Sequence, residues 1–130
     1  MVNQVIQFLR EMNMIIRIKN LRLRTIIGFN DWERKDKQDV IINVEAEFED
    51  DSLQSSGESE PPVNYRSIAK RIISEVEAAE FYLLEKLAAH LLSVVMEFSG
   101  VKKATVEVDK PHALRFADSV SISCTAERHE

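Results

Sequence analysis

One stretch of the chain, residues 40–49, constrains the fold more than any other. Its apolar side chains recur at every second position, and they are Val40, Ile42, Val44, Ala46 and Phe48. A period of two is typical of a β-strand with one buried face. The length of this strand favours a hairpin with the strand that precedes it.

The preceding strand is expected over residues 16–27, and it ends at Gly28. Its apolar positions change from even numbers, up to Ile18, to odd numbers from Leu21. An extra residue near Asn20, a β-bulge, would return all of these side chains to one buried face.

Residues 29–38 and 50–62 are predicted to be connections rather than regular elements. The first is charged, and we interpret its Trp32 as a lid on the core. The second is rich in Ser, Glu and Asp, and this composition is typical of a mobile loop.

Two amphipathic helices follow, each with apolar residues at helical spacing. The first begins after Asn64, whose side chain can cap the helix, and reaches Val76. The second begins at Leu84 and is expected to be closed by Gly100. Residues 80–82 break the helical pattern between them.

Further strands at residues 104–108 and 120–124 complete the order ββααββ. This order indicates an α+β domain with an antiparallel sheet and both helices on one face. The other face and the two edges of the sheet would then be exposed to solvent, and contacts with further copies of the chain would bury them. Cys124 is interpreted as a small core residue. The order does not match the βαββαβ order of RNA-recognition motifs.

The 130 residues fit one domain, assigned to 14–130, after a poorly ordered extension at 1–13. A net charge of −5 argues against a nucleic-acid partner. No apolar run could span a membrane, and the N-terminus lacks the charged start of a signal peptide. Three His and one Cys show no metal-ligand spacing. One Cys excludes an internal disulfide, which fits a reducing compartment, so we expect a cytoplasmic protein.

The turn after the third long strand carries the chain's most suggestive chemistry. Pro111 lacks a backbone donor, so the strand ladder should stop near Lys110. His112 and Arg115 follow within five residues. Two interpretations are open: a solvated basic turn, or an active-site lysine beside an anion-binding rim.

Four segments, in order along the chain, resemble motifs of the dihydroneopterin aldolase family. The four segments are 28–38, 64–66, 83–87 and 108–111. In segment 28–38, a glycine is followed by a glutamate five residues later and by a glutamine five residues after that. The resemblance covers roughly residues 15–128.

The resemblance implies the tunnelling fold, or T-fold. Four subunits would close their sheets into a barrel, and two such rings would stack as an octamer with active sites at subunit boundaries. The substrate would be a dihydropterin. No metal or organic cofactor is implied, because the pterin ring is itself the electron sink.

The resemblance also implies roles for individual residues. Lys110 would act through a water molecule as the base, and Tyr65 of the adjoining subunit would shuttle a proton. Glu33 would position the groups around the aldehyde fragment. Glu85 would anchor the pterin ring, assisted by backbone groups near Leu84.

Two segments, 16–25 and 109–120, resemble an epimerase branch of the family, which inverts C2′ of the pterin side chain. Residues 31–34 look more like those of aldolases, which release glycolaldehyde. The alternatives left open are therefore an aldolase and an inactive pterin-binding ring. Zinc-dependent enzymes of the same fold are disfavoured by the missing His and Cys ligands.

His112 and Arg115 are assigned to the triphosphate tail of an epimerase substrate, because guanidinium groups suit bidentate phosphate contacts. A competing interpretation pairs Arg115 with Asp118.

Overall fold

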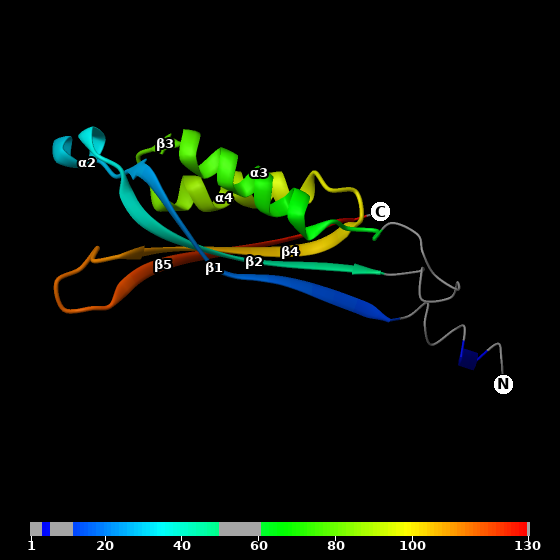
Figure 1. Ribbon diagram of the computed structural model, residues 1–130. Helices are drawn as coiled ribbons and strands as arrows, with labels where there is room; N and C mark the ends of the chain where they lie inside the picture. Colours follow the sequence, from blue (N-terminus) through cyan, green and yellow to red (C-terminus); the bar gives the residue numbers. More distant parts are fainter. Residues whose placement is uncertain (1–3, 6–11, 50–60, 130) are drawn as a thin grey trace.

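The computed structural model describes residues 4–5, 12–49 and 61–129 (Figure 1). A five-stranded sheet, in the order β3-β1-β2-β4-β5, carries helices α3 and α4 on one face. The elements in chain order are β1 (Asn13–Ile27), α2 (Asp31–Lys35), β2 (Gln38–Glu49), α3 (Tyr65–Ala78), β3 (Glu80–Phe81), α4 (Leu84–Met96), β4 (Val101–Pro111) and β5 (Ser119–Glu127).

The predicted α+β class and the hairpin of the first two long strands are confirmed, but the sheet is not purely antiparallel. The short strand β3 pairs with the end of β1 in parallel. The other neighbouring strands pair antiparallel. Two residues are too few to leave a periodic pattern, so β3 could not be recognised from the sequence.

The predicted β-bulge is confirmed. The register of β1 against β2 shifts between Ile18 and Leu21, and Asn20 has a positive φ of 54°. The backbone N–H of Asn20 donates to Oδ1 of Asn43 at 2.8 Å. The extra residue keeps the apolar side chains of β1 on the helix-covered face and directs the intervening charged ones to the free face.

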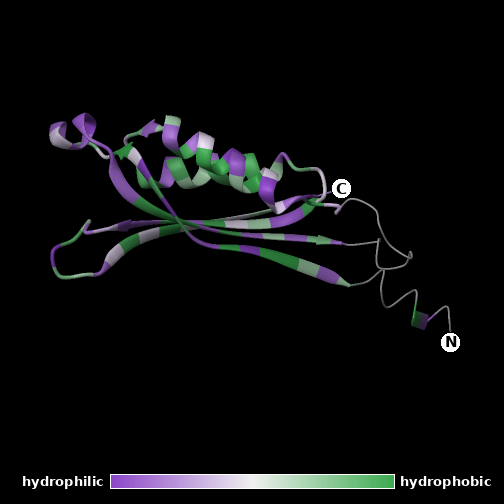
Figure 2. Cartoon of the chain, in the orientation of Figure 1, coloured by the Kyte–Doolittle hydropathy of each residue, from purple (hydrophilic) through white to green (hydrophobic). Residues whose placement is uncertain are grey.

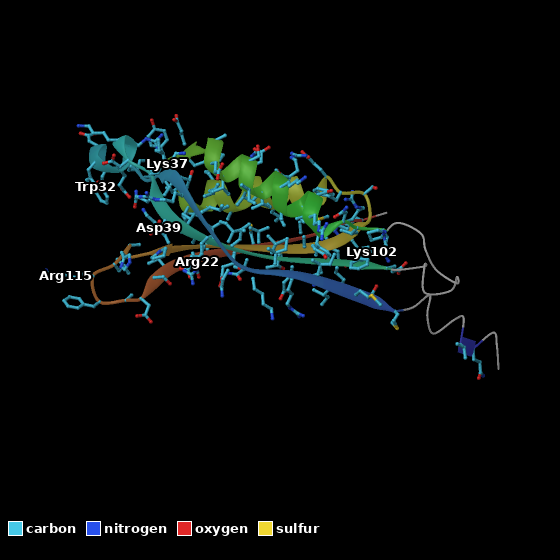
Figure 3. The ribbon with its side chains drawn as sticks, viewed as in Figure 1. Arg22, Trp32, Lys37, Asp39, Lys102 and Arg115 are labelled. Atoms are coloured by element: carbon cyan, nitrogen blue, oxygen red, sulfur yellow. The ribbon has the colours of Figure 1, made fainter. Side chains whose placement is uncertain are left out.

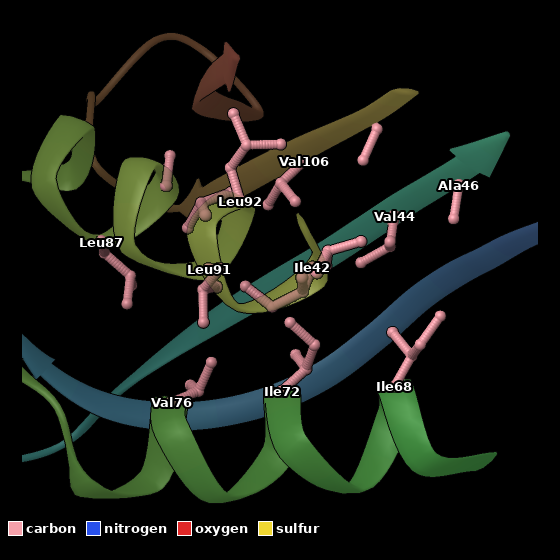
Figure 4. Packing of buried hydrophobic residues seen from close by; sticks show 14 of the residues in the cluster. Ile42, Val44, Ala46, Ile68, Ile72, Val76, Leu87, Leu91, Leu92 and Val106 are labelled. Atoms are coloured by element: carbon pink, nitrogen blue, oxygen red, sulfur yellow. The ribbon is translucent and has the colours of Figure 1, made fainter. Parts of the chain in front are cut away.

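The core lies between the sheet and the two helices (Figure 4). Ile42 of β2, Ile68 and Ile72 of α3, Leu91 of α4 and Val106 of β4 are each 0% exposed. Along the strands, hydrophobic and hydrophilic residues form alternating bands (Figure 2). The amphipathic pattern of the sequence therefore sorts the residues correctly into core and surface.

Both predicted helices are present and begin where predicted, after Asn64 and at Leu84, but the predicted end of the second helix is wrong. Oδ1 of Asn64 accepts hydrogen bonds from the backbone N–H groups of Arg66 and Ser67, so the cap of α3 is confirmed. Helix α4 ends at Met96, and Gly100 does not cap it. A Cβ at Gly100 would lie 2.8 Å from the carbonyl oxygen of Pro62, so close packing, not helix termination, explains this glycine.

Three further expectations need correction or refinement. The connection 29–38 contains the short helix α2, and its Trp32 is 64% exposed, so Trp32 is not a lid on the core of the protomer. The β4 ladder continues one residue past Lys110, to Pro111 opposite Ser119. Cys124 is half-buried and packs against the core.

The boundary predicted at residue 14 lies beside the first residue of β1. Most of the predicted extension 1–13, and loop residues 50–60, lie outside the described residues, so their order stays a prediction. Within the described part of the chain, no helix is both long enough and apolar enough to cross a membrane.

Candidate active site

Helix α2 and the end of β4 meet at a buried ion pair between Glu33 and Lys110. Nζ of Lys110 donates to Oε2 of Glu33 at 2.7 Å, and their side chains are only 16% and 7% exposed. The two residues are 77 positions apart in the sequence. Strand β2 joins them, because it follows α2 in the chain and pairs with β4 along its length.

Two amide side chains complete the surroundings of the Glu33 carboxylate. Asn30 donates to Oε1 through its side chain at 2.7 Å and its backbone N–H at 3.2 Å. Gln38 donates to Oε2 at 3.3 Å and to the carbonyl of Ile27 at 2.8 Å. Glu33 is the third residue of α2, so its bond to the backbone of Asn30 also caps the helix.

These contacts determine the charge of Glu33. Burial alone would raise its pKa, because a low-dielectric environment disfavours the carboxylate. Hydrogen bonds from Lys110, Asn30 and Gln38, together with the charge of Lys110, lower the pKa of Glu33 to about 2. The carboxylate is therefore ionised at neutral pH, and it holds the amine of Lys110 in place.

Gly28 is required by the position of Glu33. Its φ is +122°, a conformation that other L-residues rarely adopt. A Cβ on Gly28 would lie 2.2 Å from Cδ of Glu33, well inside van der Waals contact. The glycine and glutamate of the 28–38 motif are thus one structural unit, in which the small residue makes room for the carboxylate.

Arg34 fastens α2 to the rest of the domain. Its guanidinium donates to the carbonyls of Gly28, Phe81 and Glu80 at 3.3, 3.1 and 2.7 Å. The group also lies 4.1 Å from the ring centroid of Tyr82, a cation–π distance. Sequence reasoning missed Arg34 and the role of Asn30. Nothing in the sequence shows which carbonyls α2 will face, because their positions depend on β3.

The predicted pterin anchor lies at the same end of the molecule as α2. Leu84 and Glu85 begin α4, and Figure 1 shows this end of α4 close to β3 and α2. Leu84 packs against the core, whereas Glu85 is exposed. Among the described residues, no hydrogen bond or ion pair joins Glu85 to Lys110 or Glu33. In the first turn of α4, the backbone N–H groups of Lys86 and Leu87 donate to the carbonyl of Leu83, which leaves those of Leu84 and Glu85 without an acceptor within the helix.

Tyr65 lies far from Lys110 of its own protomer. It is the first residue of α3, whose 14 residues span about 20 Å. The start of α3 lies at the opposite end of the molecule from α2 and the β4–β5 turn (Figure 1). The side chain of Tyr65 is 57% exposed. It could reach a Lys110 only in another copy of the chain.

The turn between β4 and β5 is largely exposed. His112 has a positive φ of 63°, and the Phe116 side chain is 98% exposed. The Arg115 guanidinium lies 5.8 Å from the Phe116 ring centroid. Within residues 61–129, Arg115 forms no ion pair with Asp118, so that alternative is not observed.

Comparison with known proteins identifies similar sequences. The family model for dihydroneopterin aldolase (FolB) matches residues 16–125. The chain is 46% identical over 114 residues to dihydroneopterin triphosphate 2′-epimerase of Escherichia coli, covering 88% of this chain and 95% of that protein. Identity to the Pseudomonas aeruginosa epimerase is 48% over 113 residues, covering 87% and 92%. The E. coli dihydroneopterin aldolase is 26% identical over 108 residues, covering 83% and 88%.

Solved structures show the same fold. A FolB structure from Vibrio cholerae has a TM-score of 0.82 at 23% identity and covers 88% of this chain and 98% of that one. E. coli dihydroneopterin aldolase in complex with neopterin has a TM-score of 0.80 at 25% identity, covering 87% and 98%. Both neighbours are members of a T-fold family, so the predicted fold is confirmed at the level of the protomer.

Proposed function

The chain belongs to the dihydroneopterin aldolase family, and from this premise we propose that it is a dihydroneopterin triphosphate 2′-epimerase. The observation that carries the proposal is 46–48% identity to two epimerases across most of both chains, against 26% to an aldolase. The buried Glu33–Lys110 pair would supply a site for proton transfer. The reaction would convert 7,8-dihydroneopterin triphosphate into dihydromonapterin triphosphate.

We assign Glu85 and Leu84 to the pterin ring. The Glu85 carboxylate would accept hydrogen bonds from the 2-amino group and N3–H of the ring, a two-point contact that suits a carboxylate. The backbone N–H groups at the start of α4 would add further contacts near Leu84. The E. coli relative solved with neopterin supports a pterin substrate.

The reaction needs a base at the 2′-hydroxyl. Lys110, in its neutral amine form, would take this proton through a water molecule, while Glu33 holds the amine in position. The C1′–C2′ bond would then break, its electrons would enter the ring imine, and an enamine and an aldehyde would form. Tyr65 of a neighbouring subunit would shuttle a proton at this site.

An epimerase and an aldolase share these steps and differ in the fate of the aldehyde. An aldolase protonates the enamine and releases the aldehyde. An epimerase keeps the aldehyde bound until its other face is presented, and the enamine then attacks to form the inverted C2′. Retention of the aldehyde fragment is therefore the property that distinguishes the two activities.

We assign His112 and Arg115 to the triphosphate tail. Both follow Lys110 on the exposed turn, and within the described chain Arg115 has no carboxylate partner. A guanidinium can donate two parallel hydrogen bonds to a phosphate.

We further propose that the protein is cytoplasmic and acts as a homo-octamer of two tetrameric rings. The exposed position of Tyr65, far from Lys110 of the same protomer, supports a site completed by a second subunit.

Product analysis tests the proposed function. The purified protein is incubated with dihydroneopterin triphosphate and, separately, with dihydroneopterin, and the pterins are separated by chromatography. Inverted triphosphate as the main product supports the epimerase. Glycolaldehyde and 6-hydroxymethyl-7,8-dihydropterin as the main products would instead identify an aldolase. If the protein catalyses neither reaction, it is an inactive pterin-binding ring.

A further inference from the structure

A pocket of about 280 Å³ opens on the free face of the sheet beside the end of β4. Its lining includes Arg22, Arg24, Asp39, Ile41, Pro111 and His112. We call it the arginine pocket. It is separate from the residues assigned to the pterin ring, and two of its cations come from a strand to which no role has been given.

The bulge in β1 creates this pocket. Arg22 and Arg24 lie opposite Ile41 and Asp39 of β2. Without the extra residue at Asn20, the alternation of β1 would turn both arginines toward the core. With it, they lie on the free face, and Figure 3 shows Arg22 and Asp39 on neighbouring strands.

Two guanidinium groups and one carboxylate are among the side chains that line the pocket, so its lining carries a net positive charge. Nε of Arg24 lies 3.2 Å from Oδ1 of Asp39, and its Nη2 donates to the carbonyl of Lys37 at 2.8 Å. The charge of the Asp39 carboxylate is thus neutralised by Arg24. Among the described residues, the side chain of Arg22 has no ion pair or hydrogen bond. Its guanidinium is available to an anion.

The pocket begins beside the proposed catalytic lysine. Lys110, Pro111 and His112 are consecutive, so the Cα atoms of Lys110 and His112 lie within about 7 Å. Lys110 projects toward Glu33 on the helix-covered side, and Pro111 lines the pocket on the free side. The side-chain tail of a substrate bound beside Lys110 would therefore reach the pocket by passing around the end of β4. The positive φ of His112 turns the chain at that point, as strained residues at binding sites often do.

We propose that the arginine pocket binds the triphosphate tail, with Arg22 as the main contact and with Arg24 and His112 beside it. This inference rests on the proposed epimerase function. The phosphates are attached to the fragment that becomes the aldehyde when C1′–C2′ breaks. A group that holds the phosphates therefore retains the aldehyde and favours reclosure over release.

The test compares Arg22→Gln with Arg17→Gln. Arg17 is a matched control because it lies on the same face of β1 but pairs with Glu45 at 2.9 Å, outside the pocket. With dihydroneopterin triphosphate, the ratio of released 6-hydroxymethyl-7,8-dihydropterin to epimerised product should rise about tenfold in Arg22→Gln, because a charge-assisted hydrogen bond is lost. It should stay at the wild-type value in Arg17→Gln.

Inorganic tripolyphosphate provides a readout independent of turnover. Titration calorimetry at low ionic strength should detect binding to the wild-type protein, with affinity reduced about tenfold in Arg22→Gln and unchanged in Arg17→Gln. Absence of binding to the wild type, or an equal loss in both variants, would overturn the arginine pocket. If tripolyphosphate binds as expected but the wild type does not epimerise, the proposed function fails and the anion site stands.

Discussion

At the scale of single residues, Glu33 is the most constrained side chain in the protomer. Four hydrogen bonds reach its carboxylate, from Asn30, Gln38 and Lys110. The motif of a glycine, a glutamate and a glutamine at intervals of five residues therefore has a physical meaning. Gly28 makes space, Glu33 carries the charge, and Gln38 donates to it.

The low pKa of Glu33 predicts how stability depends on pH. The folded-state pKa of about 2 lies below the ordinary value of 4.5, so the carboxylate stabilises the fold fully above pH 4.5. That contribution is roughly 3 kcal/mol and is lost as the pH falls toward 2. Urea unfolding of the wild type and Glu33→Gln should differ most near pH 6 and converge near pH 2. A difference that does not change with pH would contradict this assignment.

Gly28→Ala should disrupt the site through the clash with Glu33. The strained φ and the displaced carboxylate should lower the free energy of unfolding by about 1–3 kcal/mol and reduce kcat by at least about tenfold. Gly100→Ala is a useful comparison, because its Cβ would also meet neighbouring atoms closely, at 2.8 Å from Pro62 and Val63. That variant should lose stability but keep its kcat. Similar kcat values in the two variants would argue against a link between Gly28 and the chemistry.

Arg115→Ala tests the role of the exposed turn. If Arg115 contacts phosphate, kcat/KM should fall about tenfold or more for the triphosphate and much less for dihydroneopterin, because only one substrate carries the anionic tail. Steady-state kinetics with both substrates measures this. An equal loss on both would remove the phosphate assignment of Arg115, without bearing on Arg22.

At the scale of elements, α2 is a five-residue helix that could not be stable alone. It is held by Arg34, which reaches three backbone carbonyls of β3 and the end of β1. The short strand β3 therefore serves the site indirectly, since it presents two of those carbonyls. The position of Glu33 depends on this small contact.

Arg34→Gln should loosen α2 without unfolding the domain. We expect faster amide exchange in residues 31–35, a kcat reduced several-fold, and little change in the exchange of β2 and β4, because the core does not include α2. Lys35→Gln is the matched control, because Lys35 is exposed on the same helix. Hydrogen exchange followed by mass spectrometry makes the comparison. Unchanged exchange in Arg34→Gln would show that α2 is held by other contacts.

At the scale of the whole molecule, one protomer provides only part of the proposed site. Glu33, Lys110 and the start of α4 gather at one end, and Tyr65 lies at the other. An assembly in which the start of one α3 meets the end of a neighbouring β4 would bring them together. The isolated protomer should therefore be inactive.

Mixed oligomers test this arrangement. Lys110→Ala and Tyr65→Phe should each be nearly inactive alone. When the two are unfolded together in equal amounts and refolded, random assembly should restore activity at about a quarter of the sites, because each such site takes its lysine and its tyrosine from different subunits. No recovery, although mixed assemblies form, would place both residues in the same subunit's site.

The sequence by itself determined the main elements, the bulge and the division into core and surface. These features follow from side-chain periodicity, which local residues encode without reference to the rest of the chain. The family motifs also marked Glu33 and Lys110, which the structure brings into contact. Whether they lie in an active site remains a prediction for the experiments above.

Only the tertiary structure decided what surrounds those residues. Strand β3, the Arg34 contacts and the arginine pocket depend on segments far apart in the chain, and no local pattern records which carbonyl or guanidinium they will meet. Gly100 shows the same limit, because its sequence context indicates a helix cap and its position shows close packing against Pro62. Periodicity describes a single element, whereas a binding site is built where several elements meet.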